Sequence, residues 1–151
     1  MAHSFAMTIF QGHRLRKGRF SETGRPYLVT FVTKNRERHF ADHSLARLTC
    51  QRLHEAEQQS CLKNWCYVVM PDHVHWLFSP LEGDISRIVK MVKGSISHKA
   101  GGPLWQKGFH DRAIRNESDL LPAARYVIAN PVRAGLVSSV CDYPYWNAKW
   151  L

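Results

Sequence analysis

Hydrophobic residues form two kinds of segment along this chain, short runs with the length of strands and longer segments with helical spacing. Four runs are rich in β-branched and aromatic residues and have the length of strands, namely residues 25–33, 65–70, 73–78 and 109–114. The short link Pro71-Asp72 joins the second run to the third and predicts an antiparallel hairpin. These runs together predict a sheet of four strands.

Two segments between the strands repeat apolar residues at helical spacing. The first begins at Asp42 or Ser44, either of which can cap a helix, and its stripe consists of Leu45, Leu48 and Ala56 with Leu53 at the edge. The second begins at Asp84, and its apolar face consists of Ile85, Ile88, Val89, Val92 and Ile96. Three basic residues project from the other side of this second helix: Arg87, Lys90 and Lys93.

A third helix is expected from Asn116 or Asp119 to Asn130, where Pro131 disfavours its continuation. At 100° per residue one arc of this helix is apolar and consists of Leu120, Leu121, Ala124, Val127 and Ile128. Tyr126 and Asn130 lie together on the opposite side, and because they are four residues apart they can approach the same point.

The order strand, helix, two strands, helix, strand, helix predicts an α+β fold. We expect a ferredoxin-like antiparallel sheet with helices packed on one face and the tyrosine on the last long helix. A length of 151 residues corresponds to one domain. We divide the chain into a basic N-terminal arm, residues 1–25, and one domain, residues 26–151, whose aromatic C-terminal tail is expected to close the core rather than to stack on bases.

Charge is concentrated at the start of the chain. The protein has 21 Lys and Arg against 12 Asp and Glu, a net charge of +9 and a pI of about 9.7. Residues 1–40 contain eight of these basic residues and only Glu22 and Glu37, so they carry 8 − 2 = +6. This distribution predicts a polyanionic partner, with a solvated tail as the alternative.

The cysteines and the apolar runs bear on the cellular compartment. Cys50, Cys61, Cys66 and Cys141 have neither the spacing of a zinc ribbon nor that of a disulfide framework, so we expect reduced thiols. No apolar run has the length of a membrane span, and the first ten residues lack the cationic start of a secretion signal. The sequence therefore predicts a cytoplasmic protein with no membrane partner.

Two histidines are the first candidates for chemistry. His73 and His75 point to the same face of their strand because side chains alternate, and two neutral imidazoles can share one metal ion. Together with the amide oxygen of Asn130 they form a nitrogen and oxygen set that suits Mg²⁺ or Mn²⁺ with positions open for a phosphate oxygen. The phenol of Tyr126 beside them is a candidate nucleophile for phosphorus. Each residue taken alone also has a purely structural interpretation.

The segment Met70 to Phe78 resembles the metal-binding strand of the single-tyrosine HUH transposases, and more closely that of the REP-associated tyrosine transposases. Three further motifs occur in the order of that family: Leu15-Arg16-Lys17-Gly18-Arg19, Trp105 to Asp111, and Tyr126 to Val137. The resemblance spans about residue 14 to Trp146. Val74 stands between the two histidines, and this middle position is hydrophobic in that family. Pro122 departs from an ordinary helix interior unless the helix begins near Asp119.

The resemblance implies a role for each matching residue. His73, His75 and Asn130 are expected to bind the divalent metal, and Tyr126 is expected to attack single-stranded DNA, which leaves a 5′-phosphotyrosine and a free 3′-hydroxyl. His110 and Asp111 are expected to support the site from behind these residues. Short palindromic hairpins are the expected DNA partner, with no nucleotide cofactor. The expected DNA contacts are Arg14, Arg16, Lys17, Arg19, Arg87, Lys90 and Lys93.

The leading hypothesis is thus a metal-dependent, single-strand-specific DNA nicking and joining transposase. The alternative is a catalytically inactive relative that binds hairpin DNA as a regulator. An RNA-binding ferredoxin-like module is a third possibility, but its aromatic K/R-G-F/Y-G/A-F-V motif is missing. The sequence leaves monomer and homodimer equally open.

Overall fold

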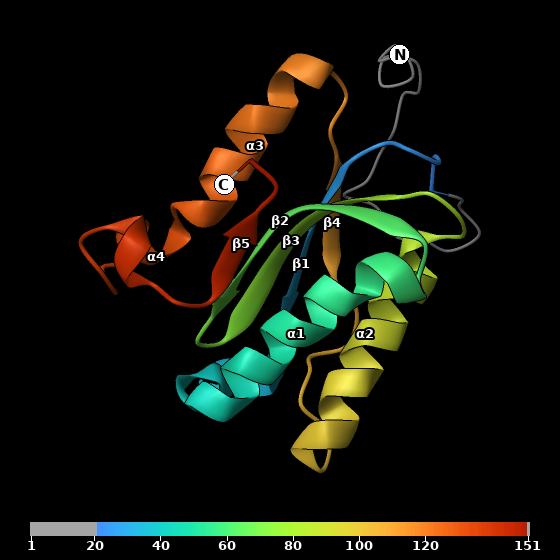
Figure 1. Cartoon of the computed structure of the whole chain (residues 1–151). Helices are drawn as coiled ribbons and strands as arrows, with labels where there is room; N and C mark the ends of the chain where they lie inside the picture. The colour runs from blue at the N-terminus through green and yellow to red at the C-terminus, as the bar shows by residue number, and fades with distance from the viewer. Residues whose placement is uncertain (1–20, 151) are drawn as a thin grey trace.

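A computed structural model describes residues 21–150 of the chain as a sheet with helices on both sides (Figure 1). The strands are β1 (Tyr27–Val32), β2 (Leu62–Met70), β3 (His73–Pro80), β4 (His110–Ala113) and β5 (Trp146–Ala148). The helices are α1 (His43–Gln59), α2 (Ile85–Ala100), α3 (Leu120–Ile128) and α4 (Asn130–Arg133). None of the helices within residues 21–150 is long and apolar enough to cross a membrane.

The sheet is antiparallel throughout and has the strand order β4-β1-β3-β2-β5. The four predicted strands and the hairpin at Pro71-Asp72 are confirmed. β5 was not predicted, because three residues are too few to show an alternating pattern. β3 lies in the centre of the sheet, where His75 is opposite Thr30 of β1 and Val68 of β2.

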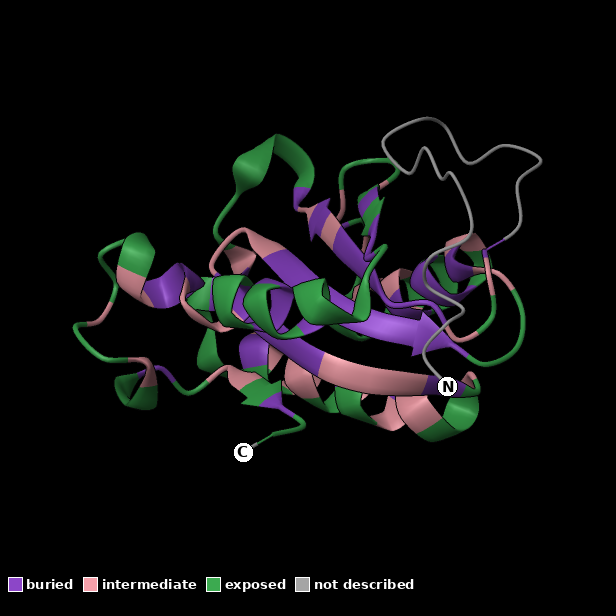
Figure 2. Ribbon diagram, turned by 90° about the horizontal axis from the view of Figure 1, so that it is seen from above, coloured by how far each residue is buried: buried purple, intermediate pink, exposed green. Residues whose placement is uncertain are grey.

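The α+β class is confirmed, with one correction to the predicted layers. α1 and α2 cover one face of the sheet, over a core that includes Val29, Trp76 and Phe78. α3 packs on the other face, over a second core that includes Leu28, Val68 and Leu77, so the helices do not share one face. Figure 2 shows the buried strands between the helices. Strand alternation explains this arrangement, because both faces of β2 and β3 are apolar and both need a cover.

The buried stripe of α2 follows the predicted spacing, whereas the stripe predicted for α1 was wrong at two of its positions. In α1 the buried positions are Ala46, Thr49, Leu53 and Ala56, while Leu45 and Leu48 are only partly buried. The five apolar residues predicted for α2 are all buried. Asp84 occupies the N-cap of α2, but its carboxylate accepts hydrogen bonds from Ser21 rather than from the helix, and the Ser21 hydroxyl accepts from the Ile85 backbone N–H.

The last helix is shorter than predicted. α3 begins at Leu120, so Pro122 lies in its first turn, where a missing N–H costs no helical hydrogen bond. It ends at Ile128, and Pro131 lies in the first turn of the short helix α4 instead of terminating α3. Ala123 is buried where we expected Leu121, whose side chain is 41% exposed.

Residues 21–25, which we assigned to the basic arm, belong to the folded domain. Arg25 is fully buried, donates to both carboxylate oxygens of Glu22 and donates to the carbonyl of Ile114. A buried guanidinium is tolerated because these acceptors replace water. The predicted DNA contacts in the arm, Arg14, Arg16, Lys17 and Arg19, lie outside the described residues.

The aromatic tail closes the second core, as predicted for most of its residues. Tyr143 is buried, and its hydroxyl donates a 2.6 Å hydrogen bond to the carbonyl of Val69. The Val69 N–H in turn donates to the carbonyl of Tyr145. Trp150 differs, because its side chain is 44% exposed and stacks on Trp65. The tail therefore holds β2, the strand before the hairpin to His73, in place.

Candidate active site

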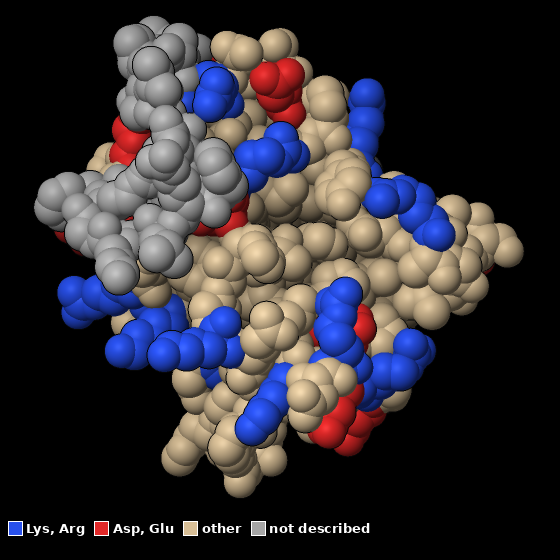
Figure 3. Space-filling model, turned by 180° about the vertical axis from the view of Figure 1, so that it is seen from behind, with Lys and Arg blue, Asp and Glu red and all other residues tan. Residues whose placement is uncertain are grey.

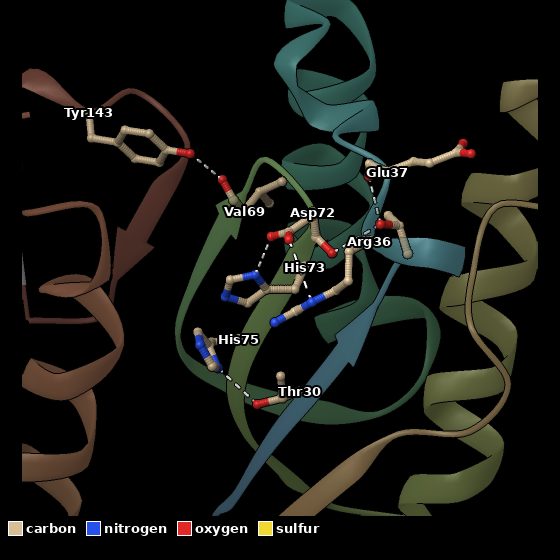
Figure 4. A network of polar contacts seen from close by, with 9 residues as sticks. Thr30, Arg36, Glu37, Val69, Asp72, His73, His75 and Tyr143 are labelled. Carbon is tan, nitrogen blue, oxygen red and sulfur yellow. Dashed lines mark hydrogen bonds and ion pairs between the residues drawn. The ribbon is translucent and has the colours of Figure 1, made fainter. Parts of the chain in front are cut away.

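His73 and His75 lie side by side on the face of β3 that α3 covers (Figure 4). Their ring centroids are 4.8 Å apart. His73 Nδ1 is 2.7 Å from a carboxylate oxygen of Asp72, and His75 Nδ1 is 2.8 Å from the hydroxyl oxygen of Thr30. His75 is buried and His73 is partly exposed, so the pair opens to solvent on one side only.

These hydrogen bonds test whether the pair suits a metal ion. A carboxylate can only accept hydrogen bonds, so Asp72 accepts one from the Nδ1–H of His73. The Nε2 lone pair of His73 is then left available. Thr30 supports the same tautomer of His75 when its hydroxyl accepts. Within residues 21–150 no cluster of three His, Cys, Asp or Glu side chains has a metal-binding arrangement, so a third protein ligand has to be an amide or a hydroxyl.

Tyr126 places its phenol beside the histidine pair. Its ring centroid is 6.0 Å from that of His75, and its side chain is 43% exposed. The guanidinium carbon of Arg133 lies 4.4 Å from the centre of the Tyr126 ring. A cation over the ring holds the phenol in place through its quadrupole and adds positive charge next to the hydroxyl.

Asn130 is buried at the start of α4, one turn beyond Tyr126. Its amide nitrogen donates to the backbone carbonyls of Tyr126 and Val127, at 2.9 and 3.1 Å. The nitrogen is therefore occupied at the end of α3, and the amide oxygen is the atom that Asn130 has left to offer to a cation. The same two bonds satisfy carbonyls that the end of a helix leaves without partners.

Burial, together with the charges of His73 and Arg133, lowers the pKa of His75 from its ordinary 6.5 to about 4. The imidazole stays neutral in the folded, metal-free protein while the unfolded chain takes up a proton below about pH 6.5. His75 therefore stabilises the fold fully above that pH, and this contribution is lost as the pH falls towards 4. We expect urea unfolding with chelator to show a loss of up to about 3 kcal/mol between pH 7 and 4 that a His75→Gln variant lacks. An equally steep loss in the variant would contradict this assignment.

The other predicted site residues divide between the two faces of the sheet. His110 is opposite Thr30 in the sheet and, with Tyr126, lines a hollow of about 200 Å³ next to His75. Asp111 is buried and is opposite Val29, which belongs to the core under α1 and α2, so its side chain belongs to the face away from the histidines. Asp111 also lines this hollow, so both residues lie next to the pair although their side chains belong to opposite faces of β4.

The three basic residues of α2 also lie on the face away from Tyr126, because α2 covers the opposite core. Arg87 and Lys90 are exposed there. Lys93 is half-buried, and its ammonium donates to the carbonyls of Gln106 and Gly108. Burial lowers the pKa of Lys93. Through these two hydrogen bonds Lys93 connects α2 to the loop before β4, a role that the spacing of the sequence did not reveal.

These hydrogen bonds predict a difference in stability between variants of two lysines of one helix. Lys93→Met keeps the aliphatic stem but removes both hydrogen bonds, and we expect it to lower the free energy of unfolding by about 1–2 kcal/mol. The matched control is Lys90→Met, for which we expect little change because Lys90 is exposed. Urea denaturation of both variants measures the difference, and equal stability would refute the role of Lys93.

Sequence reasoning missed three residues that touch the site. Asp72 directly precedes His73 and had been interpreted only as part of the hairpin link. Thr30 reaches His75 only through the pairing of β1 with β3, which no local pattern reveals. Arg133 lies in the motif that follows Tyr126, seven residues further along in α4, and its guanidinium lies over the phenol ring.

The chain was compared with known proteins. The family described as "Transposase IS200 like" matches residues 23–127. A REP-associated tyrosine transposase of Escherichia coli is 35% identical over 82 residues, which is 52% of this chain and 50% of that protein. The chain thus aligns with about half the length of this relative. A putative REP-associated tyrosine transposase of Haemophilus influenzae is 24% identical over 141 residues, 79% of this chain and 77% of that protein.

Two solved structures share the fold. A REP-associated tyrosine transposase bound to a REP hairpin superposes with a TM-score of 0.73 and 23% identity, over 93% of this chain and 82% of that one. A putative transposase from Deinococcus radiodurans superposes with a TM-score of 0.54 and 24% identity, over 75% and 95%. Because the family match covers most of the chain, including His73, His75 and Tyr126, this protein belongs to the IS200-like transposase family.

Proposed function

We propose that this chain is a metal-dependent, single-strand-specific DNA nicking and joining transposase. The observation that carries this proposal is the position of the Tyr126 phenol, whose ring centroid is 6.0 Å from His75 on the open side of a histidine pair. A phenol next to two imidazoles supplies a nucleophile and two nitrogen ligands, the parts that phosphoryl transfer to a protein side chain needs.

In this proposal Tyr126 is the nucleophile. Its hydroxyl loses a proton, its oxygen forms a bond to phosphorus, and the bond from phosphorus to the 3′ oxygen breaks. The 3′ oxygen takes up a proton and leaves as a free hydroxyl, while the 5′ phosphate stays on the tyrosine. Attack on this phosphotyrosine by a 3′-hydroxyl reverses the step and joins strands without another energy source.

The protein's other residues prepare this step. His73, His75 and the amide oxygen of Asn130 would hold Mg²⁺ or Mn²⁺, which supplies positive charge to a phosphate oxygen when bound. Asp72 holds His73 in the tautomer that leaves Nε2 available, and Thr30 does the same for His75 when its hydroxyl accepts. Arg133 holds the phenol against rotation and places positive charge over its ring.

A polyanionic substrate agrees with the charge of the chain. The net charge is +9, and Lys and Arg side chains surround a hollowed middle on the face turned away in Figure 1 (Figure 3). A related REP-associated tyrosine transposase has been solved with a REP hairpin. We therefore propose that the DNA substrate is a short palindromic hairpin with a single-stranded end.

The experiment that tests the proposal is a covalent trapping assay. The full chain is incubated with labelled hairpins from its genomic neighbourhood, with Mn²⁺, Mg²⁺ or chelator, and separated on a denaturing gel. A labelled protein band that needs the metal supports the transposase. Hairpin binding without any such band would instead identify an inactive regulator.

A further inference from the structure

The loop between β1 and α1 holds two consecutive residues in the left-handed backbone region. Asn35 has a φ of 57° and Arg36 a φ of 55°. Asparagine tolerates this region, whereas a long side chain such as arginine is disfavoured there by its Cβ. A strained backbone at this position persists only if the surrounding contacts impose it, and such strain concentrates at functional sites.

The surrounding contacts do impose it, because the loop is tied to the hairpin that carries His73. The Thr33 hydroxyl donates to the carbonyl of Glu37 at 2.7 Å, which closes the loop on itself. The Thr33 N–H donates to the carbonyl of Asp72, and the Phe40 N–H donates to that of Pro71, each at 3.0 Å. The loop therefore has a fixed position relative to the histidine pair.

Arg36 is directed towards that pair. Its Nε is 3.6 Å from one carboxylate oxygen of Asp72, and the other oxygen of that carboxylate binds His73 Nδ1. In Figure 4 its guanidinium points to the side of β3 that carries His73 and His75. The side chain is 58% exposed, and within residues 21–150 its terminal nitrogens have no hydrogen-bonded partner.

We infer that Arg36 binds a phosphate group of the DNA strand that enters the histidine site. The inference rests on the proposed function and adds a substrate contact to it. With Nε held by Asp72, the two terminal nitrogens form the free side of a planar fork, which matches two oxygens of a phosphate. An exposed ion pair with Asp72 alone contributes little to stability and does not account for a strained loop.

Two substitutions of Arg36 separate the side chain from the backbone. Arg36→Gln removes the charge, and Arg36→Gly also removes it but relieves the positive φ, so the glycine variant keeps its fold. The matched control is Arg47→Gln, which loses the same charge from an exposed position on α1, on the opposite face of the sheet. All three changes are made in a Tyr126→Phe background, in which no strand is cleaved.

The first measurement is the affinity for a fluorescent hairpin with a short single-stranded extension at each end, by anisotropy over a range of salt concentrations. We expect both Arg36 variants to bind about 10-fold more weakly and to lower the salt slope by about one phosphate contact. Arg47→Gln is expected to bind as its parent does. Mn²⁺ affinity, measured by calorimetry, is expected to stay unchanged in all variants.

The outcomes distinguish this inference from the proposed function. Equal DNA binding by the Arg36 variants and Arg47→Gln would overturn the inference, as would a loss of Mn²⁺ affinity without a loss of DNA affinity, since Arg36 would then act only on Asp72. The trapping assay with the unaltered chain tests the function separately. If that chain forms no adduct but the Arg36 variants still bind DNA more weakly, the transposase proposal fails and the phosphate contact stands.

Discussion

Tyr126→Phe is expected to abolish the covalent protein–DNA adduct completely and to leave hairpin affinity nearly unchanged. The substitution removes only the oxygen that attacks phosphorus, and the ring keeps its contacts with His75 and Arg133. Within residues 21–150 the phenol of Tyr143 cannot replace it, because its hydroxyl donates to the carbonyl of Val69 within the second core. Gel trapping measures the adduct, and anisotropy measures the affinity.

The control for this experiment is Tyr145→Phe. Tyr145 is partly buried in the tail and pairs with His43, away from the histidine pair, so its loss removes a phenol without touching the site. We expect this variant to form as much adduct as the unaltered chain. An adduct that persists in Tyr126→Phe, or that disappears in Tyr145→Phe, would show that the nucleophile has been misassigned.

His75→Ala is expected to abolish adduct formation and to remove measurable Mn²⁺ binding. In the proposed site one of the two imidazole ligands is lost, and the remaining imidazole and amide would hold a divalent ion weakly. Asp72→Asn is expected to have a smaller effect, a loss of about 10- to 100-fold in metal affinity, because it disturbs the partner of a ligand rather than a ligand. Calorimetry with Mn²⁺ gives both affinities.

A distant histidine serves as the control for the metal experiment. His98 is exposed near the end of α2, on the face of the sheet away from Tyr126, so His98→Ala is expected to keep both Mn²⁺ binding and adduct formation. Chelator is expected to stop adduct formation in the unaltered chain, and added Mn²⁺ to restore it. Cleavage that continues in chelator would contradict the role assigned to the histidine pair.

The elements of the fold were predictable because each carries a local signal. Runs of β-branched and aromatic residues mark the four longer strands, and the α2 stripe of Ile85 to Ile96 is regular enough to identify its buried face without error. The layer arrangement was not predictable. Which face α3 covers depends on both faces of β2 and β3 being apolar, and a strand that is apolar on both faces shows no alternation to assign.

The candidate site shows the same division between local and distant signals. The spacing of His73 and His75 predicted their shared face from the geometry of one strand. The approach of Tyr126 and Asn130 to one point stays a prediction, because Asn130 lies in α4 and its amide nitrogen binds the backbone carbonyl of Tyr126. Thr30 and Arg36 come from the other side of a strand pairing and from a strained loop, so only the assembled sheet reveals them. Lys93 makes contacts that its regular position on the helix did not predict, since its ammonium donates to two carbonyl groups.

The phenol of Tyr126 and the imidazole of His75 face each other within one polypeptide. Two defective copies, one lacking the phenol and the other lacking the imidazole, therefore cannot restore activity to each other when mixed, unless they exchange α3. Without such an exchange, intragenic complementation would be absent. A defective copy expressed beside an intact one would then compete for DNA without sharing its active site. A dominant effect of the defective copy in such a cell would arise only because that copy occupies the DNA hairpin.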